Sequence, residues 1–428
     1  MKISSDQLAH QIESELGAGV VTTEPTTLIS HAVDGKQPTL VCTPTTPDHV
    51  VVAMRICGSA QAAVIPWGGG TAMAVGNPPR RTDAVLKTVR LNRVIEHDHA
   101  NLTVTVQSGI TLDALQAALA PQKQFVPLDP PFPDRSTIGG TVAANLNGLR
   151  RSRYGGVRDV VIGMKVVLGT GEQIKAGGKV VKNVAGYDMC KLFTGSLGTL
   201  GIISEVTLRV APIPESIATI VANGTMSQAV QLAGELADSK LLPAAVCLRN
   251  NVAEQSWRLA VCFEGFEETV ARQLRDLSSM AQRMGMSSET LRAEDQRRVW
   301  QQLRDLPLHP DRVIYRVTVP RASVTQVIGA MQHWSAGARE ATLLADLAMG
   351  SVWTAWDNNK LAAGHFARLT ALAGQNRGHA VMFAAPPECK TGIEVWGPSP
   401  PTFSLMREIK QQFDPQGIIN PGRFVGGL

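Results

Sequence analysis

Several features are scarce or missing in this 428-residue chain, and each absence argues against a class of protein. The six cysteines form no C-x-x-C pair, which argues against an iron–sulfur cluster or zinc ribbon held by this chain alone. No run of 18 apolar residues occurs, and the first residues lack the apolar core of a signal peptide, so we expect a cytoplasmic protein. The net charge is +5 with scattered lysines and arginines, so no nucleic-acid groove is predicted.

Two common phosphate-binding motifs are also missing. G-x-x-x-x-G-K-[ST] does not occur, because Gly178-Lys179 lacks the upstream glycine, and there is no G-x-G-x-x-G. A P-loop kinase and a Rossmann dinucleotide site are therefore not supported. One local basic cluster is either a solvated loop or a site for phosphate or an acidic partner; it consists of Arg150, Arg151, Arg153 and Arg158.

What the chain does contain is three consecutive glycines directly after an apolar, strand-like run. The stretch reads Pro66-Trp67-Gly68-Gly69-Gly70-Thr71. Glycines carry no Cβ and adopt positive φ readily, so successive amides can face one phosphate or pyrophosphate. A second small-residue element, Ser136 to Asn145, predicts a helix N-terminus that approaches an anion. A flexible turn and a buried small-residue helix are the alternatives for these two elements.

Short strands alternate with helices along the chain, which predicts an α/β or α+β protein. Residues 139–201 hold 14 of the 39 glycines but are interrupted by strands, which indicates backbone packed against a large flat ligand. We expect an N-terminal helix and loop over 1–36 and a ligand-binding domain over 37–212. A second α+β domain, built as two β-α-β units side by side, is expected over 213–400, and a C-terminal helix and tail over 401–428.

Four motifs together resemble the FAD-binding domain of the vanillyl-alcohol oxidase / p-cresol methylhydroxylase superfamily. They are Pro66 to Thr71, Ser136 to Thr141, Tyr154 to Asp159 and Leu192 to Ile203, and they occur in the family's order. The resemblance implies an α+β fold: a two-subdomain FAD-binding domain of the p-cresol methylhydroxylase type and a second α+β cap domain. A C-terminal segment that returns to the FAD domain completes the implied fold.

A narrower resemblance is to the FAD-binding subunits of bacterial glycolate oxidases. It is carried by Gly148 to Arg151, Gly177 to Asp188, Trp300 to Arg304 and Phe413 to Arg423, and is weakest over 215–295 and the first 35 residues. It implies FAD-dependent oxidation of a 2-hydroxy acid, glycolate or D-lactate, to the 2-oxo acid. The implied partners are a sister FAD-linked catalytic subunit and an iron–sulfur subunit, with peripheral membrane association through them.

The resemblance also implies which residues hold FAD. Gly68 to Thr71 would bind the pyrophosphate, Thr137 to Gly140 would approach pyrophosphate and flavin, and Ile202 would lie on the adenine side. The expected FAD-binding residues are Pro66, Trp67, Gly68, Gly69, Gly70, Thr71, Pro130, Ser136, Thr137, Gly139, Gly140, Ala143, Asn145, Gly148, Tyr154, Gly155, Gly198 and Ile202. No histidine or cysteine follows the triple glycine over 72–75, so we expect noncovalent FAD.

The substrate side has a weaker signal. Stand-alone 2-hydroxy-acid dehydrogenases of this superfamily carry paired histidines and a G-E-H-G-type segment that bind a metal; neither string occurs here, so no metal is expected. His379 is the candidate base and Arg377 the candidate carboxylate ligand, with a structural pair at a strand edge as the alternative. Two other functions stay open: a flavin-binding or even flavin-free scaffold subunit without turnover, and a stand-alone FAD enzyme that oxidises another alcohol.

Overall fold

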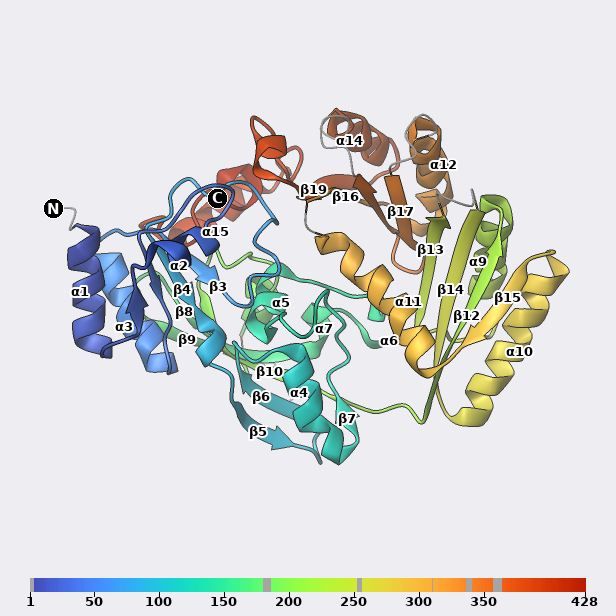
Figure 1. Cartoon of the computed structure of the whole chain (residues 1–428), viewed down its shortest axis with the longest axis horizontal. Helices are drawn as coiled ribbons and strands as arrows, with labels where there is room; N and C mark the ends of the chain where they lie inside the picture. Colours follow the sequence, from blue (N-terminus) through green and yellow to red (C-terminus); the bar gives the residue numbers. More distant parts are fainter. Residues whose placement is uncertain (1–3, 180–185, 252–255, 310, 336–340, 357–363) are drawn as a thin grey trace. The chain divides into compact units, whose positions relative to one another are not determined.

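The computed structural model describes residues 4–179, 186–251, 256–309, 311–335, 341–356 and 364–428 (Figure 1). The chain divides into two compact units. The first contains Met1–Asn147, Val157–Pro212 and Lys390–Leu428, and the second contains Gly148–Gly156 and Ile213–Cys389. Helix content and strand content are mixed in both units, so the predicted α+β class is confirmed.

The unit boundaries differ in three places from the sequence expectation. Residues 1–36 are part of the first unit, because α1 (Ser5–Leu16) packs on α3 (Pro47–Ser59). The chain returns to the first unit at Lys390 rather than at residue 401, because the Lys390 side chain is buried against Asp34 there. The short segment 148–156 lies in the second unit.

A four-stranded sheet in the first unit positions the triple glycine. Its order is β1 (Val21–Thr22), β2 (Leu40–Cys42), β4 (Ala84–Lys87), β3 (Val64–Trp67), and β2, β4 and β3 are parallel. Side chains alternate between two cores: Leu40, Val64 and Leu86 pack with α1 and α3, whereas Val41, Ile65 and Val85 pack with Leu28 of α2 (Pro25–Ser30). Two buried faces and a parallel ladder hold the end of β3, and hence the glycines, in place.

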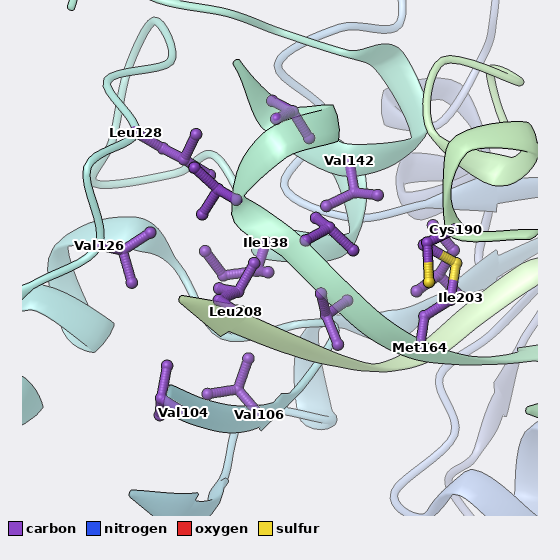
Figure 2. Close-up of a cluster of buried hydrophobic side chains, with 14 of the residues drawn as sticks. Val104, Val106, Val126, Leu128, Ile138, Val142, Met164, Cys190, Ile203 and Leu208 are labelled. Carbon is purple, nitrogen blue, oxygen red and sulfur yellow. The ribbon is translucent and has the colours of Figure 1, made fainter. Parts of the chain in front are cut away.

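A five-stranded antiparallel sheet supports the second glycine element. Its order is β5 (Val94–Asp98), β6 (Thr103–Gln107), β10 (Ile202–Arg209), β8 (Val161–Val167), β9 (Gln173–Gly177). Figure 2 shows Ile138 and Val142 of α5 (Ile138–Ala144) in the same buried cluster as Val106, Ile203 and Leu208. A seven-residue helix is too short to be stable alone, so this packing holds α5. The smaller elements of the unit are η1 (Thr88–Arg90), α4 (Leu112–Leu119), η2 (Ala120–Gln122), β7 (Gln124–Phe125) paired with β11 (Ala211–Pro212), α7 (Val157–Val160), α8 (Met189–Phe193), α15 (Phe403–Phe413) and η6 (Val425–Gly427).

The second unit is one eight-stranded antiparallel sheet built from two halves with the same order of elements. The first half runs β12 (Ser216–Gly224), α9 (Met226–Asp238), β13 (Ala245–Asn251), β14 (Ser256–Gly265), α10 (Glu267–Arg283), β15 (Ser287–Leu291). The second runs β16 (Val313–Thr318), α12 (Val324–Ser335), β17 (Ala341–Asp346), β18 (Ser351–Trp356), α14 (Phe366–Gln375), β19 (His379–Ala384). Each half is a β-α-β-β-α-β unit, and the sheet order β15-β12-β14-β13-β17-β18-β16-β19 joins them through β13 and β17.

The sequence predicts two β-α-β units side by side, and the structure has two halves side by side with more strands in each. Each half has a second hairpin strand and a fourth strand, and the two halves share one ladder. Between the halves lie α11 (Ala293–Asp305) and η3 (Leu306–Leu308), while η4 (Arg321–Ser323), η5 (Pro387–Lys390) and α6 (Arg151–Tyr154) complete the chain. Among the described residues, no helix is long and apolar enough to cross a bilayer.

Candidate functional site

A pocket in the first unit opens at the carboxyl end of β3, where the triple glycine begins. Ligands of α/β sheets bind outside the carboxyl ends of parallel strands. The pocket is open to solvent, and its empty space, open solvent included, is about 720 Å³. It is lined by Pro66, Trp67, Gly68, Gly69, Gly70, Thr71, Ala72, Met73, Thr88, Thr137, Gly139, Gly140, Ala143, Ala144, Leu197, Gly198, Gly201, Ile202, Ile203, Asn420 and Arg423.

The glycine turn presents free backbone donors to this pocket. Gly70 adopts φ +76°, the left-handed region that favours glycine. Within the described part of the chain, the amide hydrogens of Gly69, Gly70 and Thr71 have no backbone acceptor. Three consecutive free N–H groups form an anion-binding nest, which suits the oxygens of a diphosphate.

Contact between the two glycine elements explains why glycine is needed in the turn. A Cβ on Gly68 would overlap the hydroxyl oxygen of Thr137, and one on Gly69 would overlap the carbonyl oxygen of Arg135. The hydroxyls of Thr71 and Ser136 lie 3.0 Å apart and join the two elements by a hydrogen bond. The two elements thus touch directly, as one rigid wall of the pocket.

The sequence predicts that the first amides of α5 face a bound anion, but in the structure these amides donate to other groups of the protein. The N–H of Ile138 donates to the Ile110 carbonyl (2.9 Å), that of Gly139 to Ser108 (2.7 Å), and that of Gly140 to the Thr137 hydroxyl (3.3 Å). A buried helix start must satisfy its amides internally, and this one does so with neighbouring backbone and its own cap. The amides left free at the pocket are therefore those of the nest, while α5 contributes a small-residue surface at Gly139, Gly140 and Ala143.

A buried ionic cluster fixes the chain that follows the nest. Lys390 Nζ donates to both Asp34 carboxylate oxygens (2.8 and 3.0 Å) and to the carbonyls of Ala74 (2.7 Å) and Gly76 (3.2 Å). Arg423 donates to Asp34 (3.3 Å) and to the carbonyls of residues 73 (2.9 Å) and 75 (2.7 Å). Four consecutive carbonyls are thus held by two cations. We call Asp34, Lys390 and Arg423 the Asp34 cluster.

The Asp34 cluster carries a net charge of +1, because two cations share one carboxylate. Burial lowers the pKa of Arg423 to about 10 although Asp34 opposes the shift, so the guanidinium is charged at neutral pH. Burial likewise lowers the pKa of Lys390 against the effect of Asp34. Arg423 also lines the pocket, so the positively charged cluster adjoins the pocket wall.

Two unpartnered polar atoms belong to residues of the pocket wall. Arg423 Nε and Asn420 Oδ1 are buried and lack a hydrogen-bond partner among the described residues, while Asn420 Nδ2 donates to the Leu197 carbonyl (2.7 Å). A buried donor and acceptor without partners are costly unless a ligand or water meets them. Free amides, a positive wall and small residues fit a dinucleotide, so the first unit has the residues to hold FAD.

Most of the expected FAD-binding residues come together in the pocket. Those that line it are Pro66, Trp67, Gly68, Gly69, Gly70, Thr71, Thr137, Gly139, Gly140, Ala143, Gly198 and Ile202. Pro130, Ser136 and Asn145 lie in the first unit but not in the pocket wall; Ser136 is buried and its hydroxyl bonds the Pro131 carbonyl. Gly148, Tyr154 and Gly155 lie in the second unit.

Sequence reasoning missed several wall residues. They are Ala72, Met73, Thr88, Ala144, Leu197, Gly201, Ile203, Asn420 and Arg423. The segment Phe413 to Arg423 was a usable signal, because it carries the resemblance to glycolate oxidase subunits and contains both Asn420 and Arg423. Leu197, Gly201 and Ile203 lie in the motif Leu192 to Ile203 and Ala144 in the element Ser136 to Asn145, whereas Ala72, Met73 and Thr88 carry no signal of their own.

Tyr154 is held by a buried carboxylate of the second unit. Its hydroxyl donates to Glu264 Oε2 (2.6 Å), and Arg150 Nη2 lies 2.9 Å from Glu264 Oε1. Burial, and then the hydrogen bond to Glu264, raises the pKa of Tyr154 to about 12. Within this unit the pair anchors segment 148–156 to β14.

The two candidate catalytic residues lie at the start of β19. His379 is exposed opposite Thr318, and Arg377 is exposed in the preceding turn with φ +56°. The ring is only partly exposed: its partial burial, and then the charge of Arg316, lowers the pKa of His379, so its imidazole is neutral at pH 7. Among the described residues no three His, Cys, Asp or Glu side chains form a metal-binding group. Of the motif over 177–188, residues 180–185 lie outside the described part of the chain.

Comparisons with known proteins agree with this site. Residues 38–177 match the FAD binding domain, and residues 398–424 match the C-terminal domain of FAD linked oxidases. The chain is 30% identical to glycolate oxidase subunit GlcD of Bacillus subtilis, over 90% of this chain and 88% of GlcD. It is 30% identical to glycolate oxidase subunit GlcE of Escherichia coli, over 79% of this chain and 87% of GlcE. The structure of p-cresol methylhydroxylase with substrate bound shares the fold, with a TM-score of 0.78 and 16% identity over 98% of this chain and 96% of that one.

Proposed function

The chain belongs to the family of FAD-linked oxidases that includes glycolate oxidase subunits, and on this basis we propose that it is the FAD-bearing subunit of a glycolate oxidase-type complex. It is an oxidoreductase that acts on CH–OH donors with FAD as cofactor. The proposed reaction is oxidation of glycolate or D-lactate to the corresponding 2-oxo acid. The observation that carries the proposal is the pocket with its nest of free amides, Gly69 to Thr71, beside the positively charged Arg423.

The proposed chemistry divides between the cofactor and the chain. When bound, FAD supplies a two-electron acceptor for the hydride that leaves the hydroxyl-bearing carbon. His379 would take the hydroxyl proton, which its lowered pKa allows because the ring is neutral at pH 7. Arg377 is the sequence-based candidate for holding the substrate carboxylate.

The proposed assembly follows from the same relatives. Both GlcD and GlcE are named as subunits of glycolate oxidase. Since this chain carries no C-x-x-C pair, we propose that electrons leave through an iron–sulfur partner, with a sister FAD-linked subunit beside it. Association with the inner face of the membrane would then come from these partners.

Anaerobic reduction of the bound flavin tests the catalytic proposal. We expect glycolate or D-lactate to bleach the visible flavin absorbance of the purified, FAD-loaded protein, and the corresponding 2-oxo acid to appear in equal amount. Ethylene glycol, which has the hydroxyl but no carboxylate, is the control and should leave the spectrum unchanged. Bound flavin that no 2-hydroxy acid reduces would exclude turnover by this subunit.

A second candidate is a subunit that binds FAD without turnover. It is favoured by the setting of His379 and Arg377, which are exposed and whose side chains make no hydrogen bond or ion pair with the described residues. A base that nothing orients is a poor catalyst. The same anaerobic titration separates the two candidates, and a rate that appears only after adding partner subunits would support the scaffold.

We further propose that the FAD is noncovalent. No histidine or cysteine is among the residues that line the pocket, and the six cysteines are buried. Precipitation of the holoprotein with acid should therefore release all flavin into the supernatant. Yellow colour that stays with the washed pellet would refute this.

A further inference from the structure

The eight-stranded sheet of the second unit carries α14 on one face, and its other face, where α11 packs, carries a row of cations. Tyr315 of β16 stacks on Phe366 of α14, with ring centroids 5.6 Å apart, so this side of β16 faces the helices. On β12, Thr219 accepts from Trp300 of α11, which lies on the opposite side of the sheet (Figure 1). Residues paired directly across neighbouring strands share a face.

One row of paired residues crosses six strands on the face opposite α14. It is formed by Asn223, Arg258, Arg249, Leu344, Trp353 and Arg316. Three arginines thus occupy a single row of a sheet. His379 belongs to the same face, because it pairs with Thr318, two residues from Arg316.

Arg316 occupies an aromatic corner in this row. Its guanidinium carbon lies 5.4 Å from the centre of the Trp353 ring and 5.1 Å from that of Phe383. The two rings meet edge to face at 4.9 Å. The rings fix the plane of the guanidinium and remove water from its faces, so that its edge is left for hydrogen bonding.

No carboxylate of the described residues neutralises this arginine. Arg316 forms no ion pair there, and its Nε is buried without a hydrogen-bond partner. Burial and then the charge of Arg151 lower the pKa of Arg316 to about 10, and Arg316 in turn lowers the pKa of His379. Repulsion between these positive groups and the burial of Arg316 cost folding free energy. An anionic ligand would offset that cost.

We propose that Arg316, with His379 on the same face of the sheet, forms a binding site for the carboxylate of a small organic acid. Arg316 provides the planar fork that matches a carboxylate, and the charge of Arg151, which acts on Arg316, adds to the positive potential there. His379 on the same face places a neutral base near the bound acid. The inference rests on the proposed function in its choice of ligand, and it assigns the carboxylate to Arg316 in place of Arg377.

A small acid suits this geometry better than an acidic protein surface does. The guanidinium is recessed between two rings, so a compact, planar anion reaches it most easily. Arg377 lies in a turn with left-handed backbone, where strand alternation does not direct its side chain to this face.

Calorimetric titration of the full-length FAD-loaded protein with oxalate tests the site without turnover. Oxalate carries carboxylates but no oxidisable C–H bond. We expect wild-type protein to bind oxalate and glycolate, and Arg316→Gln to weaken both by about 10- to 100-fold, the usual effect of losing a charge-assisted hydrogen bond. Arg151→Gln should weaken binding several-fold. The matched control is Arg272→Gln, which changes an exposed arginine on α10 and should leave binding unchanged.

Each result of the oxalate titration decides whether the carboxylate site exists, whether or not the protein oxidises a substrate. Oxalate binding that depends on Arg316 supports the site even if no 2-hydroxy acid bleaches the flavin. In that case the proposed turnover is refuted and the site is not. Equal affinity of Arg316→Gln and wild type overturns the site even if the flavin is bleached. Absence of oxalate and glycolate binding to wild type also overturns it, as does binding only to a polyglutamate peptide. If Arg316→Gln does not fold, Arg316→Lys and Arg151→Gln carry the test.

Discussion

Removing either the single carboxylate of the Asp34 cluster or its Lys390 cation should strongly destabilise the first unit. In the native cluster two cations and one carboxylate give +1; Asp34→Asn leaves +2, and Lys390→Met leaves zero. Breaking a buried ion pair by deleting one partner costs about 3–5 kcal/mol. We expect Asp34→Asn to reach this range, because both remaining cations are then buried without a counter-charge.

Lys390→Met should cost about 2–6 kcal/mol, because two buried carbonyls each lose their donor. Asp34 keeps its contact with Arg423 at 3.3 Å, and the main loss is the pair of hydrogen bonds to the carbonyls of residues 74 and 76. Leaving a buried acceptor unsatisfied costs about 1–3 kcal/mol each. Both variants should also bind FAD more weakly, because those carbonyls belong to the segment that directly follows the nest.

Urea unfolding followed by far-ultraviolet circular dichroism, together with FAD titration of the apoprotein, measures both effects. Asp188→Asn is the matched control, because Asp188 pairs with Lys191 at 3.2 Å on the exposed surface of the same unit. Such pairs contribute about 0–1 kcal/mol. The reasoning would be refuted if Asp34→Asn unfolded at the same urea concentration as wild type, or if the control lost as much stability.

Three further predictions follow from the site and its surroundings. Gly69→Ala should weaken FAD binding and cost about 1–3 kcal/mol of stability, because its methyl group overlaps a backbone carbonyl; Gly140→Ala, which meets only a hydroxyl at 3.0 Å, should cost less. Tyr154→Phe should lower the unfolding free energy by about 1–3 kcal/mol through the loss of the Glu264 hydrogen bond, and a larger effect on FAD affinity than on stability would contradict this role. In pH profiles, kcat/KM for a 2-hydroxy acid should fall with acid through a pKa below 6.5, as His379 gains its proton, and His379→Gln should abolish that limb.

The sequence predicted the FAD domain well because its signals are local. One signal is three adjacent glycines after an apolar strand, and the other is a Ser-Thr cap before a small-residue helix. Each occupies fewer than about ten residues, and its residue types alone indicate the backbone conformation. The alternation of strands and helices likewise predicted the α+β class, which the structure confirms. In contrast, the acceptors of the α5 amides come from residues 108 and 110, about 30 positions away, and no local pattern indicates them.

Long-range partners account for most of what could not be predicted. Asp34 is joined to Lys390 and Arg423 across more than 350 residues, and a lone aspartate in a polar loop has no pattern that marks it as buried. The doubled sheet of the second unit depends on the three-residue pairing of β13 with β17, which strand propensity cannot specify. Arg316 was not predicted as a site residue for the same reason: the two rings that its guanidinium contacts, Trp353 and Phe383, come from other strands.

The chain passes between its two units four times, and this has a consequence for biosynthesis. The edge of β3 is completed by residues near the far end of the sequence: Val64 donates to the Ile418 carbonyl at 2.8 Å, and Asn420 donates back to Val64 at 2.8 Å. While the ribosome is still translating the second unit, the glycine turn therefore has an open strand edge and no Arg423 behind it. The cofactor site can mature only after residues 418–423 emerge, so nascent chains stalled earlier should be held by chaperones in a flavin-free state.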